Sequence, residues 1–364
     1  MNNSPLVLMM AGGTGGHVYP ALAVAREMQN RGFRVAWVGT SRGLEARVVP
    51  EAGIDLHHLV VRGVRGKNLL SKLLGVIYLI VASLQAIWLV LRVSPSCVVG
   101  MGGYVAGPAG VAGWLLRKPL VIHEQNAVAG TTNRLLAPFA KKVLCGFPSS
   151  FGADIDARVV GNPVRREIIE KGATLQYDFR GQRPLRLLVL GGSLGAKPVN
   201  DLLPSAVAAL ADSSAIEVWH QAGVAHAESV KRAYDDLNVE NINVAAFIEE
   251  MADAYAWADL VVCRAGALTI AELAIMGRPA ILVPLPHAID DHQSANARYL
   301  SDPGAAVLIP QSDLSPKALS ELLQQYCADS AALQKMAKIS AGLATPGATV
   351  TVSDCCEELI NERG

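Results

Sequence analysis

The chain has 364 residues, with 32 Lys and Arg, 32 Asp and Glu, and a formal net charge of zero. This length suits two medium domains, each able to bury its own core. The six cysteines form no C-x-x-C pair and no metal-finger spacing, which argues against a zinc finger or a disulfide framework and favours a reducing compartment. The first residues contain no basic stretch followed by an apolar core, so we expect no signal peptide.

The charge is distributed unevenly along the chain. Residues 1–161 carry 16 Lys and Arg against 7 Asp and Glu, whereas residues 162–364 carry 16 against 25. We therefore expect only the first part to meet an anionic partner. Few aromatic residues accompany the basic ones, so base stacking has little support and a nucleic-acid partner is not expected.

Short apolar runs alternate with helical patterns along the chain, which is typical of βαβ units and parallel sheets. We predict strands at 6–11, 35–39, 97–100, 119–122, 143–145, 185–190, 216–219, 243–246, 259–262, 280–283 and 306–309. We predict helices at 20–31, 128–137, 199–211, 226–236, 268–276 and 291–300. The pattern indicates an α/β protein with two Rossmann-like parallel-sheet domains.

The domain boundaries follow from breaks in this alternation. Gly161 to Arg165 is the expected hinge, and the polar stretch 170–184 is expected to be a loop or linker. The segment from Pro346 is expected to cross back and pack on the first domain. We therefore predict one domain from residues 1–161 plus about 346–364 and another from residues 162–345.

Two glycine-rich turns of the same kind open the two halves. Gly12 to His17 follows the run 6–11, and Gly191 to Ala196 follows the run 185–190. Glycines at a strand-to-helix turn let backbone N–H groups approach an oxyanion, and the following helix N-terminus favours negative charge. The pair predicts two domains that face a central cleft with a phosphate-bearing ligand in it, although either turn alone could be only a tight connection.

Neither turn fits the common nucleotide fingerprints. Val18 stands where the third glycine of G-x-G-x-x-G belongs, and no acidic residue follows the apolar run 35–40 to bind a ribose. Neither turn ends in the Gly-Lys-Ser/Thr of a P-loop. A nicotinamide enzyme and a nucleotide hydrolase are therefore disfavoured.

Residues 73–91 form an uncharged stretch of 19 residues, preceded by Arg62, Arg65, Lys67 and Lys72. Its length reaches that of a membrane span. We favour a partly exposed helix that dips into an anionic membrane surface through about 62–92, since basic residues beside an apolar face suit lipid headgroups. A wholly buried crossover helix is the second interpretation, and a true span is the least favoured because polar residues interrupt the stretch and no second span exists.

Two further motifs follow strands in the basic half. Gly100 to Pro108 offers a second anion cradle, which we expect to be separate from Gly12 to Gly16, unless it is a tight turn only. His123 to Asn126 ends a strand, at the edge where open parallel sheets bind ligands, and its side chains suit a polyhydroxyl substrate. Asn126 could instead cap a helix.

In the acidic half, Cys263 to Glu272 has the pattern of a strand end, a turn and a helix start. We expect Glu272 in the first turn of that helix, where it either stabilises the N-terminus or accepts hydrogen bonds from ribose hydroxyls. The segment 284–296 contains His287, Asp290, Asp291 and His292. A metal site there is disfavoured because no i, i+4 pair shares a helix face, and the Asp-x-Asp at 154–156 is disfavoured too. We expect no metal and no cofactor.

Six motifs, beginning at Gly12, Gly100, His123, Gly161, Gly191 and Gly266, together resemble the MurG family of bacterial cell-wall transferases over nearly the whole chain. The resemblance implies a GT-B-type glycosyltransferase fold, with an N-terminal domain that faces the membrane and the acceptor and a C-terminal domain that binds the sugar nucleotide. It implies an inverting hexosyltransferase of peptidoglycan synthesis that moves GlcNAc from UDP-GlcNAc to the C4 hydroxyl of undecaprenyl-pyrophosphoryl-MurNAc-pentapeptide. It also implies a peripheral position on the cytoplasmic face of the inner membrane; protein partners are not indicated.

The resemblance assigns residues to the donor. Arg165 and Ser193 match diphosphate contacts, Ile248 the uracil, Glu272 the ribose, and Gln293 with Asn296 the GlcNAc. The full donor set is Thr14, Gly15, Gly16, Asn126, Arg165, Ser193, Ile248, Ala267, Leu268, Thr269, Ile270, Ala271, Glu272, Gln293 and Asn296. Gly102, Gly103 and Tyr104 are the candidates for the acceptor diphosphate. Leu194 stands where many members carry Gln, so a side-chain contact from that position is lost.

The implied reaction is an in-line displacement at C1 of the sugar, which needs a base and a stabilised leaving group. His17 is our candidate base, because imidazole titrates near neutral pH and the glycine turn places it at the ligand. It could instead orient the loop or an acceptor phosphate. Arg165, Ser193 and the helix N-terminus behind Gly195 would stabilise the departing UDP without a metal, and closure about Gly161 to Arg165 would exclude water.

Two other classes of protein remain open. A non-catalytic sugar-nucleotide or lipid-carrier binding protein would keep both glycine turns and tolerate the loss of His17. A sugar-nucleotide epimerase of similar build would need no lipid, and the basic, apolar stretch 62–92 disfavours it.

Overall fold

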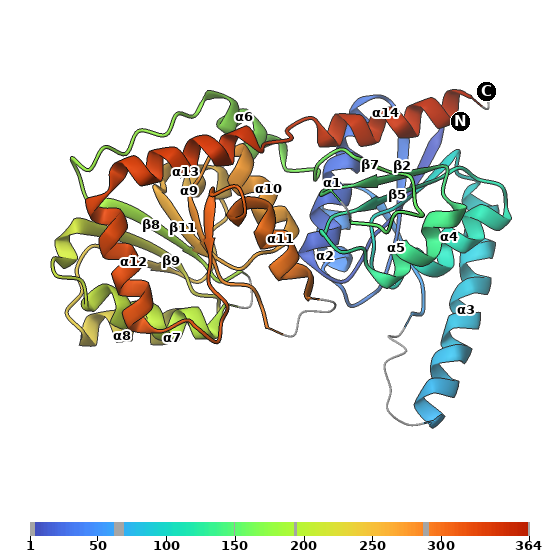
Figure 1. Cartoon of the computed structure of the whole chain (residues 1–364). Helices are drawn as coiled ribbons and strands as arrows, with labels where there is room; N and C mark the ends of the chain where they lie inside the picture. Colours follow the sequence, from blue (N-terminus) through green and yellow to red (C-terminus); the bar gives the residue numbers. More distant parts are fainter. Residues whose placement is uncertain (1–3, 62–68, 149, 193–194, 287–290, 363–364) are drawn as a thin grey trace. The chain divides into compact units, whose positions relative to one another are not determined.

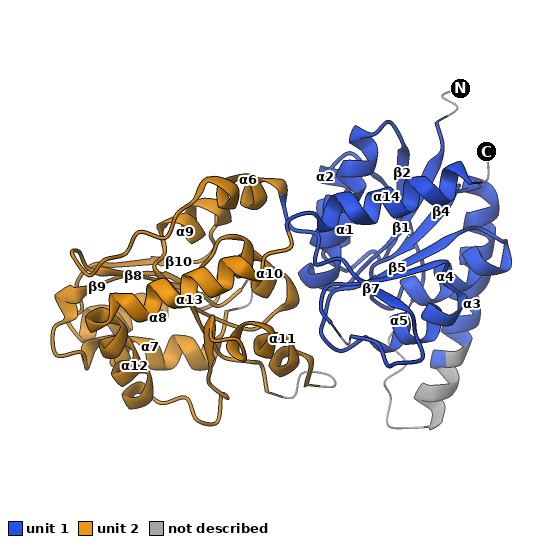
Figure 2. Cartoon of the chain, turned by 45° about the horizontal axis from the view of Figure 1, so that its top comes forward, with its two compact units in different colours: residues 1–165, 346–364 blue, residues 166–345 orange. Residues whose placement is uncertain are grey.

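The computed structural model divides the chain into two compact units, shown in Figure 2: unit 1 is residues 1–165 with 346–364, and unit 2 is residues 166–345. It describes residues 4–61, 69–148, 150–192, 195–286 and 291–362, and only the backbone of residues 69–74 and 76. The chain thus passes from unit 1 to unit 2 after Arg165, whereas the predicted boundary lies after residue 161.

Unit 1 is built on a seven-stranded parallel sheet with the strand order β3-β2-β1-β4-β5-β6-β7 (Figure 1). Because the order reverses between β1 and β4, the carboxyl ends of these neighbours mark the place where open α/β sheets bind ligands. The strands are β1 (Leu6–Met10), β2 (Arg34–Gly39), β3 (Asp55–His58), β4 (Cys97–Gly100), β5 (Leu120–Glu124), β6 (Lys142–Cys145) and β7 (Ala157–Val159).

Helices cover both faces of this sheet because its central strands are apolar on both sides. Val7 and Met9 of β1 pack in one core with α1, α2 and α14, and Leu8 and Met10 pack in a second core with α3, α4 and α5. This is the layering expected of a parallel sheet. The helices are α1 (Gly15–Asn30), α2 (Glu45–Glu51), α3 (Leu69–Val93), α4 (Ala106–Leu115), α5 (Thr131–Leu136), the 3₁₀ turn η1 (Ala137–Phe139) and α14 (Ala348–Asn361).

The last helix of the chain, α14, belongs to unit 1 and packs on α1. Val352, Cys356 and Leu359 are buried in the core that it shares with α1 and β4. At its solvent edge, Nη1 of Arg31 donates to Asp354 at 2.7 Å and to Glu357 at 2.9 Å. The apolar contact fixes α14, and the ion pairs add a smaller, screened contribution.

Unit 2 repeats the arrangement with six parallel strands in the order β10-β9-β8-β11-β12-β13. The carboxyl ends of β8 and β11 again lie side by side at the point where the order reverses. The strands are β8 (Leu185–Leu190), β9 (Ile216–Gln221), β10 (Ile242–Ala245), β11 (Leu260–Cys263), β12 (Ala280–Leu282) and β13 (Ala306–Leu308).

The helices of unit 2 also lie on both faces of its sheet. α7, α8 and α12 share one core with β8, β9 and β11, whereas α6, α9, α10 and α13 contact one another as a second group. Their bounds are α6 (Arg166–Thr174), α7 (Lys197–Ala208), the 3₁₀ turn η2 (Ser213–Ala215), α8 (Ala227–Asp236), α9 (Met251–Trp257), α10 (Ala267–Ile275), α11 (His292–Ser301), α12 (Pro316–Ala328) and α13 (Ser330–Gly342).

The predicted strands are confirmed to within a few residues, and two strands were missed. Both β3 and β7 lie at the edges of the first sheet, where their residues are mostly exposed and form no apolar run. The stretch 170–184, predicted to be a loop, is helical as far as Thr174 because it contains the end of α6. The amphipathic pattern of α6 begins before the predicted linker and continues into it.

Two valines of α14 test whether this helix stabilises unit 1 by burial. Val352 is fully buried, whereas Val350 of the same helix is 48% exposed. We expect Val352→Ala to lower the free energy of unfolding by about 2 kcal/mol, because it removes buried methyl groups and leaves a cavity. Val350→Ala gains the same helix propensity and loses little buried surface. Its free energy of unfolding should therefore change by no more than about 0.5 kcal/mol. Urea unfolding of both variants measures the difference, and equal values would contradict the assigned packing.

Candidate active site

Unit 1 contains two glycine turns, Gly12 to Gly16 after β1 and Gly100 to Pro108 after β4, and they are in direct backbone contact. A Cβ on Gly103 would lie 2.5 Å from the carbonyl oxygen of Gly12, and one on Gly102 would lie 2.8 Å from Nδ1 of His17. Both glycines have positive φ, +95° at Gly102 and +85° at Gly103. The expectation of two separate cradles was therefore wrong: β1 and β4 are neighbours in the sheet, so the turns that follow them form one continuous surface.

A buried carboxylate that the sequence analysis missed fixes the first turn. Glu45 of α2 accepts hydrogen bonds from the backbone N–H of Gly13 at 2.9 Å, the backbone N–H of Thr40 at 2.9 Å and the Thr40 hydroxyl at 2.8 Å. Burial alone would raise the pKa of Glu45, but these donors stabilise the ionised form and hold the pKa below its ordinary value. Thr14, Gly15 and Gly16 follow directly, at the start of α1.

His17 lies in the first turn of α1 and begins a line of hydrogen bonds. Its Nδ1 lies 2.8 Å from Oε1 of Gln125, and Nε2 of Gln125 lies 3.1 Å from Nδ1 of His123. Nε2 of His123 lies 2.8 Å from the carbonyl oxygen of Gly161. His123 is completely buried, and burial lowers its pKa to about 4, so it is neutral at physiological pH.

Glu124 organises the residues after β5. Its Oε1 accepts from the backbone and the side-chain amide of Asn126, at 2.9 and 3.1 Å, and its Oε2 accepts from the backbone N–H of Gly130 and the amide of Asn133. Asn126 does not cap α5, because the N-cap residue is Gly130. Half-buried Asn126 therefore lies at the carboxyl end of β5 in a fixed orientation, and Tyr104 is exposed on the turn after β4.

In unit 2 the glycine turn after β8 rests on a buried polar network. The amide of Asn200 donates to the carbonyl of Ala222 at 2.8 Å, and its Oδ1 lies 3.0 Å from Nε2 of His220. A Cβ on Gly195 would collide with that same carbonyl of Ala222, so the turn packs backbone to backbone on the end of β9. Ser193 and Leu194 lie outside the described residues.

The predicted nucleotide segment forms the turn and the first helical turns after β11. Ala267 begins α10, and Ile270 and Ala271 are buried in it, whereas Leu268 and Thr269 are half-buried. Glu272 is not in the first turn of α10, as predicted, but further along it, where it is buried and accepts from the hydroxyl of Tyr255 at 3.0 Å. The predicted helix start at residue 268 is within one residue of the observed start. The error was to assign Glu272 to the first turn of this helix. Ile248 is buried as well.

The predicted sugar-binding residues lie on α11. Oε1 of Gln293 accepts from the backbone N–H of Leu285 at 2.9 Å. Asn296 is fully buried and its amide donates to the carbonyl of Ala265 at 3.1 Å, which ties α11 to the turn before α10. Arg264 of that turn donates to the carbonyls of Val283 and Pro284 and so holds the ends of β11 and β12 together.

The metal candidates are dispersed. Within the ranges that the structure describes, no three His, Cys, Asp or Glu side chains gather as metal ligands would. His292 begins α11, and residues 287–290 lie outside the described ranges. Asp154 and Asp156 line a separate pocket beside β6.

The apolar stretch 73–91 lies in α3, and among the described side chains of this helix one face is buried and the other is exposed. Ala82, Ala86 and Val90 are buried on the face of α3 that packs in the core of unit 1. The interpretation as a wholly buried helix was wrong, because the opposite face of α3 is exposed. That face exposes Ile77, Leu79, Ile80, Val81, Leu84, Trp88 and Leu91. No helix among the described residues is long and apolar enough to cross a membrane.

The sequence analysis missed further exposed apolar side chains on the neighbouring elements α4, α5 and η1. α4 packs on α3 and α5 packs on α4, and Trp114 stacks on Phe139 with ring centroids 4.6 Å apart. The exposed apolar side chains of these elements are Val111, Trp114, Leu115, Leu135 and Phe139. Together with the exposed residues of α3 they form what we call the apolar surface, and Arg92, Arg117, Lys118 and Arg134 lie on the same elements or directly beyond them.

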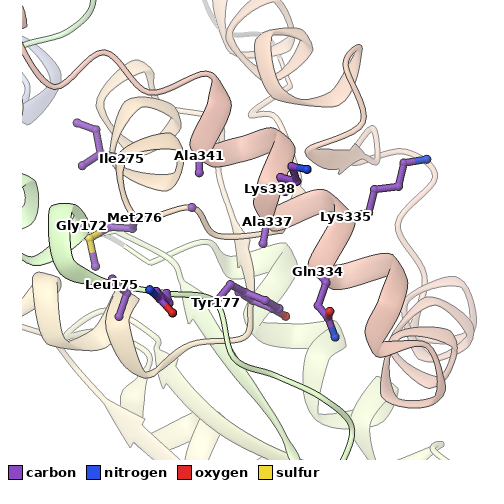
Figure 3. Close-up of a pocket in the computed structure, with 12 residues that line it drawn as sticks. Gly172, Leu175, Tyr177, Ile275, Met276, Gln334, Lys335, Ala337, Lys338 and Ala341 are labelled. Carbon is purple, nitrogen blue, oxygen red and sulfur yellow. The ribbon is translucent and has the colours of Figure 1, made fainter.

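A pocket of about 550 Å³ in unit 2 is distinct from these residues (Figure 3). It lies at the carboxyl end of α10, and its lining includes Met276, Tyr177, and Lys335 and Lys338 of α13. The candidate nucleotide segment lies at the opposite, amino end of α10. None of the candidate residues lines this pocket.

Comparison with known proteins identifies the class. Residues 7–145 match the glycosyltransferase family 28 N-terminal domain, and residues 186–352 match the glycosyltransferase family 28 C-terminal domain. The chain therefore belongs to glycosyltransferase family 28, whose members transfer sugars, and its two parallel-sheet units are those of a GT-B-type enzyme.

Individual relatives narrow this class. The UDP-N-acetylglucosamine--N-acetylmuramyl-(pentapeptide) pyrophosphoryl-undecaprenol N-acetylglucosamine transferase of Ectopseudomonas mendocina (strain ymp) is 53% identical over 97% of this chain and 98% of its own length. The crystal structure of Acinetobacter baumannii MurG is 39% identical, with a TM-score of 0.83 over 97% of this chain and 99% of that one. The calicheamicin glycosyltransferase CalG4, at 17% identity and a TM-score of 0.69 over 99% of each chain, shares the fold alone.

The backbone contact between the two glycine turns can be tested at Gly103. Alanine there meets both an unfavourable φ of +85° and the carbonyl of Gly12, whereas alanine at Gly32, with a φ of +86°, meets no atom within 4 Å. Both substitutions should cost about 1–2 kcal/mol for the left-handed backbone. We expect Gly103→Ala to cost several kcal/mol beyond Gly32→Ala in urea unfolding, because a backbone atom cannot move aside as a side chain can. Equal losses would contradict the contact.

Proposed function

We propose that the chain transfers GlcNAc from UDP-GlcNAc to the C4 hydroxyl of undecaprenyl-pyrophosphoryl-MurNAc-pentapeptide, with inversion at C1, in peptidoglycan synthesis. The observation that carries this proposal is the 53% identity, over almost the full length of both chains, to a transferase with that donor and acceptor in its name. The enzyme is then a hexosyltransferase. The same similarity disfavours the two alternatives, a sugar-nucleotide epimerase and a non-catalytic binding protein.

The donor would bind at the carboxyl ends of β8, β11 and β12 in unit 2. The diphosphate would lie against the glycine turn after β8, beside the start of α7, because a helix N-terminus favours negative charge. Glu272 would accept from the ribose and Ile248 would pack by the uracil. Because Oε1 of Gln293 accepts from the N–H of Leu285, its Nε2 would be the atom that donates to the sugar.

Not every predicted donor contact has equal support. Asn296 is fully buried, and its amide donates to the carbonyl of Ala265. Its contacts therefore favour a role in holding the turn before α10 over a direct contact with the sugar. Arg165, the last residue of unit 1, would meet the diphosphate as UDP leaves. A stabilised leaving group of this kind needs no metal.

The acceptor would bind unit 1 at the joined surface of the two glycine turns, with its diphosphate against Gly102, Gly103 and Tyr104. His17 stands where those turns meet, in the first turn of α1. We propose it as the base that takes the proton of the C4 hydroxyl as the hydroxyl oxygen attacks C1 of GlcNAc and the bond from C1 to UDP breaks. An alternative role, orienting the acceptor diphosphate, is supported by the same contact with Gly102.

The apolar surface would hold the enzyme at the cytoplasmic face of the inner membrane, where a polyprenyl acceptor lies. Seven exposed apolar side chains on α3 and five on α4, α5 and η1 exceed what scattered surface residues provide. Arg92 lies over the ring of Trp88 at 5.1 Å, so a cation flanks an aromatic side chain suited to a membrane interface. The basic residues Arg62, Arg65 and Lys67 lie outside the described residues, and their part in binding is inferred from their sequence position.

The transfer reaction is tested with labelled UDP-GlcNAc, with and without the lipid-linked acceptor, in the presence of EDTA throughout. We expect acceptor-dependent transfer, because neither the base nor the diphosphate site requires a metal. His17→Ala should lower kcat by about 100-fold or more. His58→Ala, at an exposed position of the same unit, is the matched control and should retain wild-type kcat. Conversion of the nucleotide sugar without acceptor would refute the transferase and favour an epimerase.

The membrane proposal is tested with Leu84→Glu and Leu237→Glu, which place the same charge on exposed leucines of α3 and of unit 2. We expect Leu84→Glu to weaken binding to vesicles containing anionic phosphatidylglycerol by at least about 10-fold, since an inserted leucine is lost and a charge must approach the lipid. Leu237→Glu should bind as wild type does. With a short-chain, water-soluble acceptor, Leu84→Glu should retain full activity; equal vesicle binding by both variants would contradict the proposal.

A further inference from the structure

The hydrogen-bond line that starts at His17 is anchored at its far end by backbone carbonyls. The carbonyl oxygen of Gly161 lies 2.8 Å from Nε2 of His123, and the carbonyl oxygen of His123 accepts from Nε2 of Gln125 at 3.0 Å. A carbonyl oxygen has no proton and can only accept. These two contacts therefore decide which atoms in the line carry hydrogens, without reference to any ligand.

The first anchor determines the tautomer of His123. Because Gly161 can only accept, Nε2 of His123 must carry the proton. His123 is fully buried and neutral, so its Nδ1 has no proton and must accept. The atom 3.1 Å from that Nδ1 is Nε2 of Gln125, which is a donor. The geometry and the required direction of donation agree.

The second anchor determines the orientation of the Gln125 amide. Its NH₂ group donates both to Nδ1 of His123 and to the carbonyl of His123, so a flipped amide would place an oxygen against two acceptors. Gln125 is 1% exposed, so water does not compete for these positions. Its Oε1 therefore faces His17, and an amide oxygen can only accept.

We infer that Gln125 and His123 are positioning residues that set the tautomer of His17, with the proton on Nδ1 and the lone pair on Nε2. In neutral His17, Nδ1 must donate to Oε1 of Gln125 across 2.8 Å, which leaves Nε2 as the basic nitrogen. The inference rests on the proposed function in one respect: the lone pair matters for catalysis only if His17 is the base. The orientation itself follows from the hydrogen bonds.

Two packing contacts support a single orientation of the ring. Gly102 lies directly against Nδ1, Cε1 and Cγ of His17, so the ring rests on a backbone that has no side chain at that point. The side-chain amide of Asn162 donates to the backbone carbonyl of Gln125 at 3.0 Å, which fixes the residue that accepts the hydrogen bond from His17. The line therefore joins α1, β5 and the segment that begins at Gly161, and each member restrains the next.

The tautomer is measured directly in the wild-type protein. Long-range ¹H–¹⁵N spectra of histidine-labelled enzyme, at about pH 8.5 where ordinary histidines are neutral, distinguish a proton on Nδ1 from one on Nε2. His17→Ala identifies the His17 signals. We expect Nδ1–H for His17 and Nε2–H for His123. A proton on Nε2 of His17, or a rapidly averaged mixture, would overturn the inference, and this readout needs no variant at 123 or 125.

Kinetics test whether the line acts through His17. Gln125→Met keeps the length of the side chain but removes its acceptor and donors, and we expect kcat to fall at least about 10-fold with little change in the KM for UDP-GlcNAc. In the His17→Ala background the same substitution should cause no further loss, because residues that act as one unit are not additive. Gln29→Met, at the opposite end of α1, is the matched control and should keep wild-type kcat.

The outcomes separate this inference from the proposed function. Additive losses in the double variant would show that Gln125 acts elsewhere and would overturn the inference even if His17 is the base. Full activity of His17→Ala would refute the base and with it the catalytic role of the line. Acceptor-dependent transfer, the expected His17 tautomer and non-additive losses together support both.

Discussion

The contact between the backbones of Gly12 and Gly103 constrains everything else at the carboxyl ends of β1 and β4 in unit 1. It exists because β1 and β4 are adjacent parallel strands that end at the same edge of the sheet, and because neither turn carries a side chain where they meet. Close approach of the turns brings the start of α1 against Gly102, and His17 lies within hydrogen-bonding distance of Gln125, directly after β5. The buried carboxylate of Glu45 then ties the first turn, through the N–H of Gly13, to the N–H and hydroxyl of Thr40 after β2.

The two units share one device, a buried neutral histidine. In each, a completely buried histidine behind the ligand-binding edge is kept neutral by burial, which lowers its pKa to about 4. His123 lies behind the base candidate, and His220 lies behind the glycine turn of unit 2, bonded to Asn200 and to the hydroxyl of Tyr234. A neutral histidine donates a hydrogen bond from one ring nitrogen and accepts one at the other. It therefore fixes which of its two neighbours is the acceptor and which is the donor, in an apolar interior where a charged ring would be costly.

The sequence was sufficient for the features that depend on local periodicity and insufficient for those that depend on contact between distant segments. Central strands such as 6–10 were predicted because both faces are buried and the run is continuously apolar. The edge strand β3 contains Asp55 and two histidines and has no such pattern. The glycine turns and most motifs of the site could be located from spacing, but Glu45 acts on Gly13 across 32 positions, and no local pattern marks it. Gln125 was visible only as part of a motif, because its partner His17 lies 108 positions away.

The return of the chain to unit 1 has a consequence for how the protein is made. Unit 2 ends at residue 345, whereas unit 1 needs α14, whose residues Val352, Cys356 and Leu359 complete one of its two cores. A chain that emerges from the ribosome amino end first can finish unit 2 before it can finish unit 1, which reverses the usual order in which the domain synthesised first is the first to fold. Until α14 has emerged, the apolar residues of α1 that it covers stay exposed.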